Sequence, residues 1–334
     1  MTLRFDTAFC RLAGIDLPIV QAPVGGITTP ALAAAVSEAG GLGMLSITWR
    51  DPDDLRALLR ETRARTEKPF AVNLVLEWDP AERLAIALEE GVRVISFFWG
   101  DPAPWVDRIH AAGGIVLHTV ASAAEARRAA DAGVDALVAQ GWEAGGHVWG
   151  EVSTLALVPR VVDAVAPLPV VAAGGITDGR GLAAVLALGA GAAWMGTRFL
   201  LAEEAATHPV YQQAVIAADE TATAYSALFD VGWPDAPLRA LRNSTWEAWH
   251  AAGEPDVGAR PGEGEIVATG EDGRDIARYC NDCPVIGASG DIAAMALYAG
   301  QGVGLAQRIQ PAGEIVREVA EEAARVLAET RVVG

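Results

Sequence analysis

A glutamine and a histidine stand at the two ends of a glycine-broken stretch just before the middle of the chain. The stretch runs from Gln140 to His147 and follows the run 135–139, which is apolar after Asp135 and is typical of a buried parallel strand. Glycines let the backbone approach a planar ligand closely, and histidine is the side chain that titrates nearest neutral pH. A lone histidine is often structural, but the position of His147 after a glycine pair favours a functional role in a ligand site.

Two turns with glycines follow later apolar runs. Gly174 and Gly175 come after the run 170–173, and Gly196 ends the run 193–196 and is followed by Thr197. In (β/α)₈ barrels the loops after the seventh and eighth strands commonly bind phosphate through bare backbone N–H groups. The alternative is that these glycines serve only tight turns. Two such turns, at both places where barrels bind phosphate, favour a phosphate site.

Two amide side chains end predicted strands. Asn73 lies in the apolar run 70–74, and Gln140 ends the run 136–140. A buried amide must find hydrogen-bond partners, and a lone one often just ties loops together. Two amides that converge on one barrel mouth, opposite a phosphate site, suit the donor and acceptor edge of a flavin ring. The sequence therefore favours FMN over a bare sugar phosphate.

Three further side chains are candidates for the substrate pocket. His118 lies in the predicted strand 115–119, where it either lines the pocket or belongs to the core. Trp99 ends the strand 94–98 and could wall a flat ligand or simply pack. Tyr298 lies near the end of a predicted helix, residues 292–299, from which it could reach over the site.

The elements that position these residues alternate between apolar runs and alanine-rich helical stretches, which is the signature of βαβ units in α/β proteins. The predicted strands are residues 18–22, 43–46, 70–74, 94–98, 115–119, 136–140, 170–173 and 193–196. Eight such units predict a (β/α)₈ TIM barrel. A doubly wound sheet is the competing fold, but no GxGxxG follows the first strand.

The regular alternation ends near Leu201. Residues 1–210 are expected to form the FMN-binding barrel core. Residues 211–290 are rich in Trp, Pro and Gly, and we expect an irregular insertion or small subdomain that could act as a lid. Residues 291–334 are expected to supply two C-terminal helices, near 292–299 and 314–329, that pack on the barrel.

Composition limits the partners of the protein. The chain has 334 residues, 51% of them hydrophobic, and a formal net charge of −18, which disfavours nucleic acid and anionic membrane surfaces. No basic region followed by an apolar core begins the sequence, and no uncharged run is long enough to span a bilayer. We expect a cytoplasmic protein that acts on a small molecule and could form a homodimer.

The cysteines number three, an odd count that argues against a disulfide framework. Cys280 and Cys283 have the spacing of half a zinc site or of a redox pair. No second Cys or His pair stands near them in the sequence. Ordinary thiols are therefore favoured, and no metal site is predicted.

Several of these stretches resemble, in order, the motifs of the nitronate monooxygenases, also called 2-nitropropane dioxygenase-like proteins, which are FMN-bound (β/α)₈ barrels. The matching stretches are 18–23, 73–74, 140–147, 172–178, 195–199, 298–304 and 311–312. The resemblance gives His147 the catalytic position. The cofactor-binding residues expected from strand ends and from the resemblance are Ala22, Pro23, Asn73, Gln140, Gly145, Gly174, Gly175, Trp194, Met195, Gly196 and Thr197.

The chain departs from the family pattern at two places. Trp194 replaces the usual glutamine before Met-Gly-Thr, and Trp99 places a large indole in the strand-four motif. The resemblance implies an FMN-dependent oxidation of alkyl nitronates by O₂ to a carbonyl compound and nitrite. The alternative is an FMN-dependent NAD(P)H reductase of a quinone or enoyl thioester on the same fold. A flavin-free barrel that binds a sugar phosphate is a third, different class.

Overall fold

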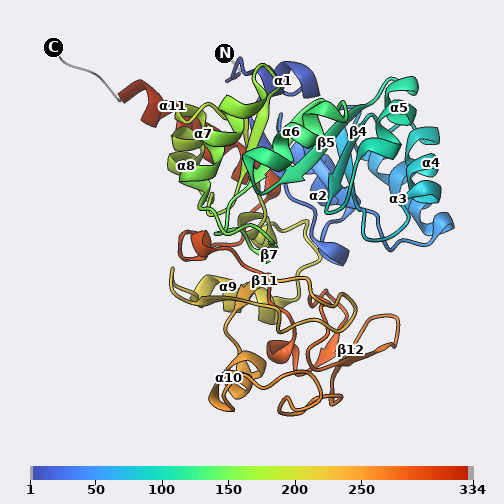
Figure 1. Cartoon of the computed structure of the whole chain (residues 1–334), viewed down its shortest axis with the longest axis vertical. Helices are drawn as coiled ribbons and strands as arrows, with labels where there is room; N and C mark the ends of the chain where they lie inside the picture. The colour runs from blue at the N-terminus through green and yellow to red at the C-terminus, as the bar shows by residue number, and fades with distance from the viewer. Residues whose placement is uncertain (1–2, 330–334) are drawn as a thin grey trace.

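The parallel strands of the barrel come from the first two-thirds of the chain. The computed structural model describes residues 3–329 (Figure 1), so the outermost ends of the predicted segments, residues 1–2 and 330–334, lie outside it. The strands are β1 (Ile19–Gln21), β2 (Gly43–Ser46), β3 (Phe70–Val75), β4 (Val94–Phe98), β5 (Ile115–Val120), β6 (Ala136–Gln140), β8 (Val170–Ala173) and β9 (Ala192–Met195). They form one 8-stranded sheet.

The sheet closes on itself. Its strand order is β1-β9-β8-β6-β5-β4-β3-β2, with parallel pairing throughout. A parallel bridge between Val20 and Leu42 joins the two end strands. The prediction of a (β/α)₈ TIM barrel is therefore confirmed. Its seventh and eighth strands are β8 and β9, because β7 (Gly146–His147) pairs outside the barrel.

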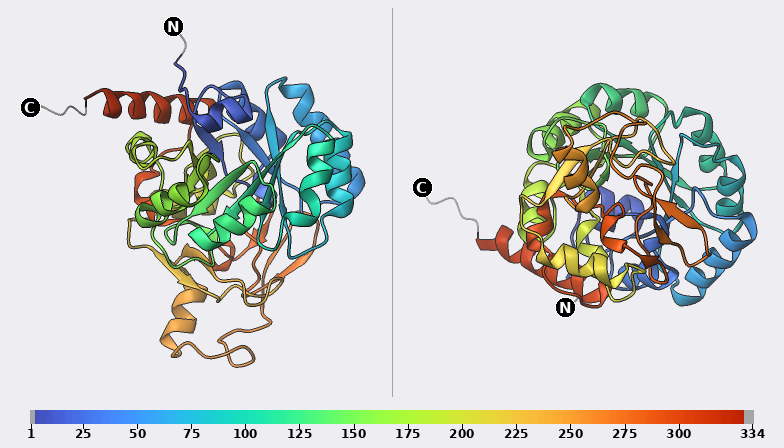
Figure 2. Two further views of the ribbon diagram at one scale, coloured as in Figure 1. Left: turned by 45° about the horizontal axis from the view of Figure 1, so that its top comes forward. Right: turned by 90° about the horizontal axis from the view of Figure 1, so that it is seen from below.

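Helices surround the barrel as an outer ring, which is visible end-on in Figure 2. They are α2 (Pro30–Glu38), α3 (Pro52–Arg65), α4 (Ala81–Glu89), α5 (Ala103–Ala111), α6 (Ala123–Asp131), α7 (Thr154–Val165) and α8 (Gly179–Ala187). The long helix α11 (Ala312–Glu329) packs against α8 and α2. The short helix α1 (Ala8–Ala13) carries Phe9 and Cys10 into the cluster inside the barrel, at the end away from the site.

The alternation of side chains along each strand separates the interior of the barrel from the layer under the helices. In β5, Leu117 belongs to the interior cluster, whereas Val116 and Val120 belong to the outer one. In β6, Val138 points inward and Leu137 points outward. This period of two decides which strand-end side chains can reach a site in the barrel mouth.

Residues 209–298 form most of a second body of structure across the C-terminal mouth of the barrel, coloured yellow to orange-red in Figure 1. It contains more regular structure than the sequence predicts. Its elements are α9 (Pro209–Ala217), β10 (Thr223–Ser226), β11 (Leu238–Leu241), α10 (Ser244–Ala251), β12 (Ile266–Thr269), β13 (Asp275–Ala277) and β14 (Ser289–Gly290). These strands are too short for a strong sequence pattern, since each spans two to four residues.

The predicted helix at 292–299 is wrong. Only a 3₁₀ turn, Ile292–Ala294, forms there, and Tyr298 lies in an extended segment that bridges to Ala240. The carbonyls that a helix would use are taken by neighbouring chain: Asn243 donates to Met295 O and the amide of Leu241 donates to Leu297 O. Tertiary hydrogen bonds therefore override the local helical preference.

From residue 3 to residue 329, no helix combines the length with the apolar character that a membrane crossing requires.

Candidate active site

A cavity of about 1030 Å³ lies where the barrel mouth meets the second body of structure. Its size is at the upper end of small-molecule sites, which suits a cofactor together with a second ligand. Most of the predicted site residues line it. They are Ala22, Pro23, Asn73, Gln140, Gly145, His147, Gly174, Gly175, Trp194, Gly196, Thr197 and Tyr298.

Three predicted site residues do not line the cavity. Met195 is 1% exposed and packs in the outer layer, because the strand period turns Trp194 inward instead. His118 is turned outward from β5 for the same reason. Trp99 has a φ of 66° and packs behind the cavity-lining ring of Phe98, with 5.7 Å between ring centroids.

His147 is held by both the barrel and the second body of structure. It belongs to the loop after β6, yet as part of β7 it pairs with Leu238 of β11. Its Nδ1 lies 3.1 Å from the carbonyl oxygen of Ala236. Since a carbonyl can only accept, Nδ1 carries the proton, and the neutral ring keeps its lone pair on Nε2.

Burial decides the charge of His147. It lowers the pKa of the imidazole from 6.5 to about 4, although hydrogen bonds to the backbone of Ala236 and Pro237 act in the opposite direction. The ring of Trp233 covers it, with centroids 4.2 Å apart. His147 is therefore a neutral base at physiological pH, able to take a proton at Nε2.

Gln140 presents an unsatisfied acceptor. Its Nε2 donates to the carbonyl of His147 over 3.1 Å, whereas its Oε1 is buried without a hydrogen-bond partner. A buried polar atom of this kind is costly unless a ligand satisfies it. Asn73, three strands along in the sheet, is fixed by donation to the carbonyl and hydroxyl of Ser96 at 3.3 and 3.2 Å. Both amides face the interior of the barrel mouth.

The turn after β8 is an anion-binding nest. Gly174 and Gly175 have φ values of 113° and 69°, which favour glycine. The backbone N–H groups of Gly175, Ile176 and Thr177 find no acceptor within the described chain. All three residues line the cavity. Consecutive free amides in such a turn suit a phosphate.

The N-terminus of α8 itself is not part of this nest. Its first amide, that of Gly179, donates to the carboxylate of Glu322 over 2.8 Å, and the side chain of Asp178 accepts from Gly181. An anion would therefore meet the glycine turn before the helix. The hydroxyl oxygen of Thr197 accepts from the amide of Gly300 over 3.0 Å and so links the strand end to the closing segment.

Gly145 lines the cavity and also lets the loop that carries it pack closely against the segment at Gly300. A Cβ there would lie 2.4 Å from the amide nitrogen of Gly300, and one at Gly300 would lie 2.8 Å from the carbonyl of Glu143. The loop that carries His147 thus packs backbone to backbone on the closing segment. Tyr298 of that segment donates through its hydroxyl to Asn281 O and accepts at its carbonyl from Tyr211.

Arg239 is an important residue that the sequence did not reveal. It is 2% exposed, and its guanidinium donates twice to the carbonyl of Trp142, at 3.2 and 3.0 Å. It also lies over the Trp142 ring, 4.2 Å from the centroid. Within residues 3–329 it forms no ion pair. A single arginine in the short run 238–241 gives no sequence signal of burial, because arginine in a short strand usually faces solvent.

The cysteines form no pair. Cys280 and Cys283 are free thiols that line the cavity, and burial raises the pKa of Cys283 to about 12. Such a thiol stays protonated and is a poor nucleophile.

Comparison with known proteins agrees with this geometry. The family model described as nitronate monooxygenase matches residues 6–322. A nitronate monooxygenase of Pseudomonas aeruginosa is 36% identical over 94% of this chain and 98% of that protein. A dehydrogenase of Mycobacterium tuberculosis that acts on a hydroxy-methyl-oxo-octahydroindene carboxyl-CoA is 39% identical over 71% of this chain and 67% of its own.

Solved structures share the whole architecture. FabK from Thermotoga maritima has a TM-score of 0.81 at 34% identity, covering 97% of this chain and 98% of that one. A nitroalkane oxidase from Streptomyces ansochromogenes has a TM-score of 0.78 at 31% identity, covering 96% and 99%. The predicted family is thus confirmed, and the chain belongs to the nitronate monooxygenase family of oxidoreductases.

Proposed function

We propose that this protein is an FMN-dependent monooxygenase that oxidises alkyl nitronates with O₂ to a carbonyl compound and nitrite. Overall, two nitronate anions and one O₂ give two carbonyl molecules and two nitrite ions. The observation that carries the proposal is that three features share one cavity. They are a neutral His147, the unsatisfied Oε1 of Gln140, and the anion nest formed by the backbone N–H groups of residues 175–177.

The residues present fit FMN. The amides of Gly175, Ile176 and Thr177 would hold its phosphate, and Gln140 Oε1 would accept from an N–H at the ring edge. Asn73 would lie along the same edge. When bound, the flavin supplies the electron-transfer chemistry between the nitronate and oxygen.

The chain supplies the proton chemistry and the orientation of the substrate. His147 Nε2 takes the acidic Cα proton of a neutral nitroalkane, and the Ala236 carbonyl keeps the ring in the required tautomer. With a preformed nitronate no proton need move, and His147 only positions the anion. Trp233 excludes water from one face of the imidazole.

The decisive experiment compares two reductants of the purified yellow protein without oxygen. Propionate 3-nitronate should bleach the flavin without NADH, and readmitted O₂ should yield nitrite and aldehyde in equal amounts. Bleaching by NADH at a catalytic rate, with none by nitronates, would overturn the proposal. A colourless protein that FMN cannot reconstitute would support the flavin-free barrel.

A second candidate function is an FMN-dependent NAD(P)H reductase of a quinone or enoyl thioester. The similarity to FabK and to the carboxyl-CoA dehydrogenase, at 34% and 39% identity, favours it. The anaerobic experiment separates the two functions, because only the reductase would need NAD(P)H.

A further inference from the structure

Several aromatic side chains line the cavity, and three that pack together form what we call the aromatic wall: Trp78, Phe98 and Trp233. Trp233 stands at its centre, with ring centroids 5.0 Å from Trp78 and 6.4 Å from Phe98. Its contact with the His147 ring places the wall directly next to the proposed base. A substrate held for proton transfer to His147 would therefore touch the wall.

The wall is two layers thick. Behind it, Trp99 lies 4.9 Å from Trp233 and 4.8 Å from Trp149, and Trp149 lies 5.2 Å from Phe98, all between ring centroids. The rings meet edge to face or tilted, which is a favourable packing for aromatic groups. Because these neighbours fill the space behind Phe98 and Trp233, the two rings cannot retreat to admit a thicker ligand.

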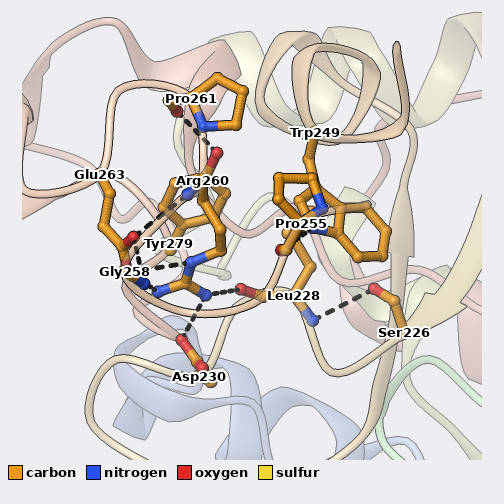
Figure 3. A network of polar contacts seen from close by, with 10 residues as sticks. All are labelled: Ser226, Leu228, Asp230, Trp249, Pro255, Gly258, Arg260, Pro261, Glu263 and Tyr279. Atoms are coloured by element: carbon orange, nitrogen blue, oxygen red, sulfur yellow. Dashed lines mark hydrogen bonds and ion pairs between the residues drawn. The ribbon is translucent and has the colours of Figure 1, made fainter. Parts of the chain in front are cut away.

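Trp233 is carried by residues 228–237, which we call the strap. Arg260, whose side chain is 4% exposed, anchors the start of the strap by donating to Leu228 O at 3.1 Å and to the Asp230 carboxylate at 2.8 Å (Figure 3). Glu263 accepts from the same guanidinium at 2.7 Å, and the Tyr279 ring lies 4.3 Å from it. The start of the strap is thus fixed by a buried, fully paired cation.

The other end of the strap is fixed by the His147 loop. The Ala236 carbonyl accepts from His147, and the Pro237 carbonyl accepts from the amide of Val148 over 2.9 Å. In the middle, the amide of Trp233 donates to Asp230 O over 3.1 Å. One segment therefore both orients the base and presents the indole that covers it.

We propose that the aromatic wall recognises a planar apolar body, an aryl or fused-ring group, carried next to the reacting carbon of the substrate, with Trp233 as the specificity-determining residue. This inference rests on the proposed function, for which it names the substrate class. Flat aromatic surface offers a ring a large contact area without any charge, whereas a short carboxylate-bearing nitronate gains nothing from it. The anionic alternative would use Arg50, which also lines the cavity.

The test measures kcat/KM for three nitronates: those of nitroethane, 3-nitropropionate and phenylnitromethane. The wild-type protein should prefer the phenyl compound at least about 10-fold, as expected for added apolar contact in a pocket. Trp233→Leu should lose this preference mainly through KM, and Trp233→Phe should keep most of it. Trp246→Leu, which changes a tryptophan of α10 outside the cavity, is the matched control.

Two results would overturn the inference: equal kcat/KM for the phenyl and ethyl nitronates, or a preference for propionate 3-nitronate that Arg50→Gln abolishes. A binding measurement separates this failure from that of the proposed function. Calorimetric titration of the flavin-loaded protein with 2-naphthoate and with acetate should show tighter binding of naphthoate, weakened about 10-fold or more in Trp233→Leu. If the protein bound naphthoate in this way but oxidised no nitronate, the proposed reaction would be wrong. The inference that the aromatic wall recognises a planar apolar group would still be supported.

Discussion

The two sides of the cavity are built by different means. The barrel side presents backbone amides and neutral side chains at strand ends, such as the nest at Gly175 and the amide of Gln140. The opposite side presents Trp233 on the irregular strap, which buried Arg260 anchors, packed against Trp78 and Phe98 from the barrel. The first arrangement follows from the regular geometry of a barrel and suits a cofactor that a whole family shares. The second depends on a few long-range contacts and can change with the substrate.

The two buried arginines sharpen this contrast. Arg260 is paired with two carboxylates and anchors the start of the strap, away from the base. Within the described part of the chain Arg239 forms no ion pair: it donates to a carbonyl and a hydroxyl and lies over aromatic faces, with the charge of Glu143 nearby. A buried cation that forms no direct ion pair is costly. Its position under the loop from Gln140 to His147 indicates that it shapes this loop.

Replacing His147 should produce the largest loss of activity. It should also show that cofactor binding by the barrel side does not depend on the base. His147→Ala should keep its flavin, which the barrel side holds, yet lose about 10²- to 10⁴-fold in kcat/KM with a neutral nitroalkane. Loss with the preformed nitronate should be much smaller. Oxygen uptake with both substrates measures the difference, and His110→Ala on the outer helix α5 is the control.

The pH profile gives an independent check of the same base. Because the pKa of His147 is lowered to about 4, the wild-type rate with a neutral nitroalkane should persist as pH falls past 6.5 and decline only near pH 4. A decline centred near pH 6.5 would show that His147 is not the buried neutral base described above.

Stability should also depend on pH through the two buried histidines. Burial lowers the pKa of His118, like that of His147, from 6.5 to about 4. Between these values the unfolded chain binds a proton that the native state does not, so stability is complete above pH 6.5 and falls as pH drops to 4. The loss should be up to about 3 kcal/mol for each histidine.

A matched variant isolates this effect. His118→Leu removes a side chain that lies outside the cavity and whose Nδ1 lacks a partner. Its free energy of unfolding, from urea titrations between pH 4 and 7.5, should vary less than that of the wild type by up to about 3 kcal/mol. Other titrating groups are common to both proteins and cancel. Parallel curves would contradict the assignment for His118.

Exchanging the arginines tests whether the two anchors act on different steps. Arg239→Met should cost about 1–3 kcal/mol of stability by leaving the Trp142 carbonyl unsatisfied, and it should lower kcat for every substrate. Arg260→Met should instead raise KM for ring-bearing substrates and leave kcat with ethyl nitronate nearly unchanged. If both variants changed the same kinetic parameter, the division between base loop and strap would be wrong.

The smallest effect concerns the hydroxyl of Thr197. Because this hydroxyl already accepts from Gly300, Thr197→Val should cost only about 1 kcal/mol in thermal unfolding. The affinity for FMN should change by no more than a few-fold. Thr177→Val, which loses a bond to Gly302 O, is the paired control. Release of the flavin by Thr197→Val alone would show that the side chain, and not the backbone, binds the phosphate.

The sequence predicts the barrel side of the site well. The run that ends at Gln140 and the glycines at 174–175 follow directly from strand length and turn chemistry, which are local properties. The period of two within each strand could also have placed His118 and Met195 outside the cavity, because neighbours in each run, Leu117 and Trp194, must face the opposite way.

The strap side could not be predicted in the same way. Trp233 and Arg239 lie in short segments without periodicity, and their positions depend on contacts with residues far away in the chain, such as Tyr279 and Trp142. The failed helix at 292–299 has the same cause, since its carbonyls are taken by Asn243 and Leu241. Long-range hydrogen bonds leave no local trace in the sequence.

The two-residue strand β7 has a consequence for synthesis of the protein. The bond that orients His147 comes from Ala236, 89 residues later in the chain, so a nascent chain holds every barrel strand before it holds this bond. N-terminal parts of a protein generally fold first as it leaves the ribosome. We therefore expect the barrel strands to be in place during synthesis before the base is oriented. An intermediate at this stage could not catalyse proton transfer through an oriented His147 until the last third of the chain emerges.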